Sequence, residues 1–91
     1  MSPTVSTQVV TLLTAAPRME EAKRIARTLV SERLAACANV IPGVSSVYWW
    51  EGQLQEEQEA MLVIKTTAAQ VNALETRLVE LHPYDVPELL S

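Results

Sequence analysis

The stretch AACANVIPGVSSVYWWEG, residues 35–52, is the most informative segment of this chain. It contains the only cysteine, a Pro-Gly pair and both tryptophans, and otherwise has the composition of one long strand over about residues 36–50. Typical strands run about 5–6 residues. A strand this long in so small a protein must bend sharply or extend beyond the body of its own subunit. Because proline removes a ladder donor and glycine tolerates positive φ, we expect a bulge or bend at Pro42-Gly43.

The segments on either side of this strand complete a βαββαβ order. The patterns predict a strand, a helix, the long strand, a hairpin turn, a returning strand, a second helix and a last extended segment, over residues 8–14, 18–34, 36–50, 51–55, 58–66, 68–81 and 86–90. Apolar residues at helical spacing, such as Ile25 and Leu29, indicate the first helix. Pro83 ends the second helix, since the residue before a proline disfavours the helical region.

This order predicts an α+β fold, a ferredoxin-like βαββαβ sandwich in a single domain over residues 1–91. We expect one antiparallel sheet with an extended central hairpin. Each βαβ crossover is right-handed, so both helices should cover the same face of the sheet. Residues 1–7 are polar and are expected to be flexible.

The opposite face of the sheet is also apolar by sequence. Residues 9–13 and 60–64 are apolar at nearly consecutive positions, hence on both faces of their strands. Hydrophobic residues make up 48% of the chain and charged residues 20%, which is rich for a small soluble protein. We therefore expect the sheet's uncovered face to bury against partner chains.

Composition narrows the classes of partner. The net charge is −4, the sequence pI is about 4.8 and the seven cationic residues are scattered, so nucleic-acid binding is disfavoured. No apolar run approaches the roughly 20 residues that span a bilayer, so no membrane partner is expected. A lone cysteine and no signal-peptide pattern favour a cytoplasmic location.

Several motifs in order resemble the CutA family of divalent-cation tolerance proteins, which are linked to copper tolerance. They are the runs ERLAAC, NVIPG, YWWEG, IKT and HPYDVPE, at residues 32–37, 39–43, 48–52, 64–66 and 82–88. Together they cover about residues 8–90 in the family's order and spacing.

The resemblance implies a ferredoxin-like subunit in a tight homotrimer, with extended hairpins crossing between subunits. It implies a response to copper and other divalent cations, no enzymatic activity and no required cofactor. Metal binding, to Cu(II) or another divalent cation, is expected to be weak or indirect. The alternative is a trimeric sensor like the PII signalling proteins, which would bind a small ligand in clefts between subunits.

Two features depart from the family pattern. Family members continue into a longer last strand and a short final helix, so by this resemblance both are cut short at Ser91. In some members a cysteine and two consecutive histidines ligate copper. This chain has Leu13, Leu81 and His82 at those positions, so one of the three ligands is present.

His82 is the only histidine and hence the one imidazole ligand for a metal. It would need carboxylates such as Glu59 or Asp85, or ligands from a neighbouring subunit. The alternative is a structural histidine at the end of a helix, stabilised by the helix dipole. A metal site of His82 and Glu59 is therefore one of two interpretations.

The loop after His82 is the candidate ligand cleft. Tyr84, Asp85 and Glu88 combine a phenol with carboxylates, an acid–base repertoire. The prolines in this loop fit a rigid connector into the last strand equally well. A hydrolase using His82, Tyr84 and Asp85 is the least favoured function.

The aromatic run Tyr48, Trp49 and Trp50 is expected to anchor a subunit interface, because large rigid rings on an extended arm are typical of interfaces. Stacking on a ligand is the alternative. Cys37 is expected to be an inert, packed thiol. Glutamates flank the hairpin turn and read as a solvated tip or, less commonly, as ligands for a hard cation.

Overall fold

The computed structural model describes residues 8–82 and 89–90. Its elements are β1 (Val9–Ala16), α1 (Met19–Ser31), β2 (Cys37–Trp50), β3 (Gln53–Thr67), the 3₁₀ helix η2 (Ala68–Gln70), α2 (Val71–Leu81) and β4 (Leu89–Leu90). Within these residues the strands form one antiparallel sheet in the order β2-β3-β1-β4. The predicted ferredoxin-like fold is confirmed. The expected flexibility of residues 1–7 lies outside the described residues.

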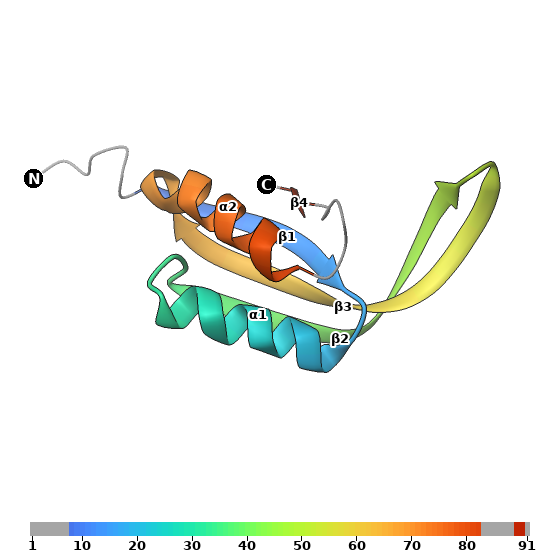
Figure 1. The fold of residues 1–91 in the computed structure, drawn as a ribbon, viewed down its shortest axis with the longest axis horizontal. Coiled ribbons are helices and arrows are strands. Elements are labelled where there is room, and N and C mark those ends of the chain that lie inside the picture. Colours follow the sequence, from blue (N-terminus) through green and yellow to red (C-terminus); the bar gives the residue numbers. More distant parts are fainter. Residues whose placement is uncertain (1–7, 83–88, 91) are drawn as a thin grey trace, which may run out of the picture.

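The core lies between the sheet and one layer formed by α1 and α2 (Figure 1). Leu12 of β1 pairs with Ile64 of β3, and both are almost fully buried beneath the helices. The helices contribute the buried stripes predicted from their spacing, Ile25 and Leu29 on α1 and Leu74 on α2. No helix in the described part of the chain is long and apolar enough to cross a bilayer.

The opposite face of the sheet is apolar and has no helix over it among the described residues. Leu13 pairs with Val63 and Ala15 pairs with Met61, and all four residues are half-buried. Their positions alternate with the core residues of the same strands, so they face away from the helices. The apolar character predicted for this face is therefore present.

The β2–β3 hairpin projects from the body of the molecule (Figure 1), and the described chain measures 52 × 25 × 21 Å along its principal axes. The register shifts between Ile41 and Val44, where Pro42 and Gly43 lie on β2 opposite a single residue of β3. Gly43 has a φ of +68°. The predicted bulge is confirmed at this position.

The predicted turn over 51–55 and returning strand over 58–66 are wrong at their boundaries. Only Glu51 and Gly52 form the turn, with φ of 49° and 78°, and β3 resumes at Gln53. Positive φ at both central residues is the geometry of a two-residue type I′ turn. The polar residues after the turn are typical of a loop. They lie in a strand here because both faces of the projecting hairpin are exposed to solvent and can carry polar side chains.

Helix α1 ends at Ser31, three residues before the predicted boundary at 34. Arg33 takes a left-handed φ of 62°, its N–H bonds the Val30 carbonyl, and the N–H of Leu34 bonds the Leu29 carbonyl. These paired bonds are a Schellman motif, in which glycine usually occupies the left-handed position. The apolar spacing continues to Leu34 because Leu34 closes this cap against the core, not because it is helical.

The cap predicts opposite effects for one substitution at two positions. Arg33→Gly should stabilise the protein by about 0.5–1 kcal/mol, because it relieves about 1–2 kcal/mol of left-handed strain against a smaller backbone-entropy cost. Arg27→Gly, at an exposed position within α1, should destabilise it by about 1 kcal/mol. Urea unfolding at one fixed protein concentration measures both. Destabilisation by Arg33→Gly would show that Arg33 carries a compensating contact.

Candidate functional site

His82 lies where α2 ends, and it ties that helix to β1. Its backbone N–H makes the last bond of α2, to the Leu78 carbonyl at 2.8 Å. Its side chain turns inward, is 7% exposed, and its Nε2 forms a hydrogen bond with the Ala15 carbonyl oxygen. Because a carbonyl only accepts, Nε2 carries the proton and the neutral ring has its lone pair on Nδ1.

Two carboxylates act on this imidazole from other elements. Glu21 lies in the first turn of α1, and Glu59 lies on β3 opposite Val44, next to the bulge. Burial is the largest influence and lowers the pKa of His82, while the Ala15 bond and the negative charges of Glu21 and Glu59 act in the opposite direction. His82 is therefore neutral near pH 7.

Positive charge lies on the α1 side of the site. Arg24 donates to the Leu81 carbonyl at 2.9 Å, which fixes the end of α2 against α1, and its charge adds to the lowering of the His82 pKa. Glu21 forms an ion pair with Arg18 through Oε1, while its Oε2 is buried without a hydrogen-bond partner in the described structure. The site thus combines one neutral imidazole with nearby carboxylates and two guanidinium groups.

These residues do not form a multi-ligand metal centre. Across residues 8–82 and 89–90, no three His, Cys, Asp or Glu side chains are placed to hold a metal ion. Leu13 and Leu81, which the sequence resemblance aligns with copper ligands of some CutA proteins, are half-buried apolar residues. A tight transition-metal site needs three or four donors, so the described residues do not fit one.

The other sequence-predicted residues lie apart from this site or outside the described part of the chain. Tyr84, Asp85 and Glu88 are not among the described residues, so the predicted ligand cleft stays a prediction. Tyr48, Trp49 and Trp50 are all exposed on the hairpin, and Trp49 is the most exposed of them at 73%.

On the hairpin, a hydrogen bond from Tyr48 to the Glu57 carboxylate raises the pKa of Tyr48.

The prediction that Cys37 is packed is wrong, because Cys37 is exposed, with Sγ 3.8 Å from Asn39 Oδ1. It lies at the start of β2, an edge strand of the sheet, where no described element covers it.

Sequence reasoning missed Glu21 as a neighbour of His82. By sequence alone, Glu21 is an acidic residue suited to the first turn of a helix, where the dipole favours a negative charge. The available signal was its position four residues before Ile25, which places it along the buried stripe of α1. That spacing shows burial, but the approach of α1 to the end of α2 is needed to place Glu21 beside His82.

The lowered pKa of His82 predicts a pH dependence of stability. An unfolded histidine titrates near pH 6.5, and the folded one at lower pH, so between these values the unfolded state binds more protons. The contribution of the neutral His82 to the free energy of unfolding should therefore be fully present above about pH 6.5. It should decline as the pH falls below that value. His82→Gln removes this titration. Thermal unfolding is measured in the presence of EDTA from about pH 7.5 to 5.5. The Tm of the wild type should fall more over this range than the Tm of the variant. Equal falls would contradict a buried neutral histidine.

Comparison with known proteins shows where this architecture occurs. A family model described as CutA1 divalent ion tolerance protein matches residues 10–91. The chain is 47% identical over 75 residues to the chloroplastic protein CutA 1 of Oryza sativa subsp. japonica, which covers 82% of this chain and 42% of that protein. It is 46% identical over 80 residues to the divalent-cation tolerance protein CutA of Thermus thermophilus, with 88% and 78% covered.

Solved structures agree with the fold described above. The crystal structure of CutA1 from Oryza sativa superimposes with a TM-score of 0.90 at 40% identity, covering 96% of this chain and 80% of that one. The chain thus spans less than half of the chloroplastic rice protein and about four-fifths of the bacterial protein and the rice crystal chain.

Proposed function

Because the chain belongs to the CutA1 family of divalent-ion tolerance proteins, we propose that it is a divalent-cation tolerance protein that forms a homotrimer. In this proposal it contributes to the tolerance of cations such as copper, and its binding of the metal is weak or indirect. The observation that carries the weak-binding part is the His82 site. It supplies one imidazole, and Glu21 and Glu59 lie near enough to act on its charge, so donors of the kinds that Zn²⁺ and Cu²⁺ accept are present in this region of the described structure without being placed together as ligands.

The same geometry explains why such binding would be weak. Nε2 of His82 already donates to the Ala15 carbonyl, so a cation must use Nδ1 or displace that bond. The ring is buried, and bringing a cation beside it requires dehydrating the ion. With fewer than three ligands preset, much of the binding free energy is spent on rearranging the site.

Calorimetric titration of the purified protein with Cu(II) and with Zn(II) tests this assignment. We expect weak binding, and His82→Ala should reduce the affinity by at least about tenfold, since even outer-shell changes cost that much. Glu59→Gln should reduce it too, whereas Glu56→Gln, the same change at an exposed position near the hairpin tip, should not.

Other outcomes redirect the assignment. Binding that is unchanged by His82→Ala would place the cation elsewhere and overturn the His82 site. Heat with a panel of nucleotides and none with either metal would favour the PII-like sensor.

The proposed trimer rests on apolar surface that a single chain leaves exposed. Val47, Trp49 and Leu54 are 59%, 73% and 56% exposed, and Trp49 pairs directly with Leu54 across the hairpin. The half-buried apolar residues of the open sheet face, such as Leu13 and Val63, add to this surface. Soluble monomers rarely expose apolar patches of this kind, and association would cover them.

A matched pair of substitutions separates hairpin contacts from a general effect of surface charge. Val47 on the hairpin and Val79 on α2 are exposed to nearly the same extent, 59% and 58%. We expect Val47→Lys to shift the oligomer toward smaller species at low micromolar concentration, because it would bury a charge at the interface. Val79→Lys should leave the mass unchanged. Sedimentation equilibrium measures both, and a monomeric wild type would refute the trimer.

A further inference from the structure

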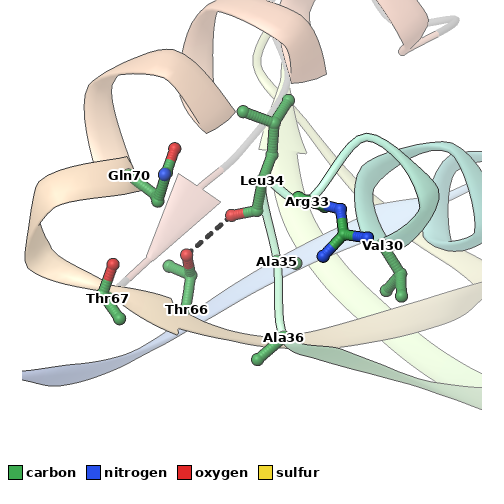
Figure 2. A pocket seen from close by; sticks show the side chains of 8 residues that line it. All are labelled: Val30, Arg33, Leu34, Ala35, Ala36, Thr66, Thr67 and Gln70. Atoms are coloured by element: carbon green, nitrogen blue, oxygen red, sulfur yellow. Dashed lines mark hydrogen bonds between the residues drawn. The ribbon is translucent and has the colours of Figure 1, made fainter. Parts of the chain in front are cut away.

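A pocket of about 410 Å³ lies between the end of α1 and the start of η2, away from His82. Arg33 and Val30 border it on the α1 side, and Thr67 and Gln70 on the η2 side, with the segment 34–36 between them (Figure 2). Pockets that hold small molecules begin at about 300 Å³. The pocket is therefore large enough for a ligand of modest size.

Arg33 is a fixed cation at one end of this pocket. The Schellman cap holds its backbone in the left-handed region, so its side chain starts from a rigid position. The neighbouring Glu32, which could neutralise it, is held instead by Arg77 of α2 through two bonds of 2.9 Å. That contact also lowers the pKa of Glu32, which keeps the carboxylate ionised and paired. Among the described residues, no hydrogen bond or ion pair is made by the Arg33 guanidinium, and its backbone N–H is used in the cap.

Neutral polar groups stand at the other end. The hydroxyl of the buried Thr66 donates to the Leu34 carbonyl at 2.7 Å, as Figure 2 shows, so it is committed to holding the 34–36 segment against β3. Thr67 and Gln70 have no such bond within the described structure. A hydroxyl and a carboxamide are thus available to donate to or accept from a ligand.

The middle of the pocket is apolar, and its backbone donors are already used. The N–H groups of Leu34 and Ala35 bond the Leu29 carbonyl, and that of Ala36 bonds the Lys65 carbonyl. Because residues 35 and 36 are alanines, their side chains leave space above the segment, while Val30 and Leu34 provide apolar walls. An anion here must be bound by the Arg33 side chain, and the body of the ligand would contact apolar groups.

We propose that this pocket binds a small monocarboxylate with an apolar body and a hydrogen-bonding group at its far end. The carboxylate pairs with the Arg33 guanidinium, whose planar fork suits bidentate recognition. The apolar body lies across residues 34–36, and the far polar group meets Thr67 and Gln70. Among the described lining residues, Arg33 is the one charged group, which matches a single carboxylate better than a phosphate with its higher charge. This proposal does not depend on cation binding at His82.

The test uses 4-hydroxyphenylacetate as the probe, because it has a carboxylate, an apolar ring and a distal hydroxyl. Its titration into ¹⁵N-labelled protein should shift the amide signals of residues 33–36 and 66–70. The shifts should saturate with a dissociation constant of a few millimolar or below, as a ligand of about ten heavy atoms permits. The amide analogue, 4-hydroxyphenylacetamide, should bind at least about tenfold more weakly because it lacks the charge.

Variants separate the pocket from the fold. Arg33→Gly suits the left-handed backbone, so it should fold at least as well as the wild type while losing at least about tenfold in affinity. Arg27→Gln makes the same change in net charge on α1, outside the pocket, and should leave binding intact. Gln70→Ala should reduce the affinity for 4-hydroxyphenylacetate more than the affinity for phenylacetate, which lacks the hydroxyl.

Three results obtained with the acid and its amide would overturn the proposal. They are the absence of saturable shifts in residues 33–36 and 66–70, shifts that persist unchanged in Arg33→Gly, and equal binding of the acid and its amide. Titration with inorganic phosphate is the remaining arm. Tighter binding of phosphate than of the acid at the same amides would exclude the monocarboxylate assignment.

Discussion

β2 and β3 pair from Cys37–Lys65 at the base of the sheet to Trp50–Gln53 at the hairpin tip, and the rest of the structure is arranged around this ladder. At its base, β3 also pairs with β1 and carries one wall of the core. Beyond the bulge it has no further strand beside it in the described structure. Pairing along this ladder satisfies the backbone N–H and C=O groups that the two strands turn toward each other. On the projecting part, however, no other element of the described chain covers the apolar side chains.

The bulge joins these two parts without ending either strand. Two residues of β2 face one residue of β3, so the side chains of β2 change face relative to a regular continuation while the pairing resumes. Glu59 lies at this junction, where β1 is close to its end, and it thus comes near His82. The bend that projects the hairpin therefore also shapes one side of the His82 site.

The two ends of the helical layer have different chemistry. Where α2 ends, His82 bonds β1 and Arg24 bonds the last turn of α2, so the polar groups there are engaged in holding α1, α2 and β1 together. Where α1 ends, Arg77 holds Glu32 and leaves Arg33 beside an open pocket. Because Glu32 is paired with Arg77, it does not neutralise Arg33, and the charge of Arg33 remains available to a ligand.

Local patterns in the sequence were sufficient to predict the order of elements, the ferredoxin-like fold, the bulge at Pro42-Gly43 and the apolar second face, because alternation, helical spacing and Pro-Gly chemistry are local properties of the chain. It also identified His82 and Glu59 as a possible pair. The three-dimensional packing was needed to show that Glu21 joins them, that Cys37 is exposed, and that Arg33 occupies a left-handed cap beside a pocket. These depend on how α1 docks against α2 and β1, and local spacing cannot specify contacts between residues that lie far apart in the chain.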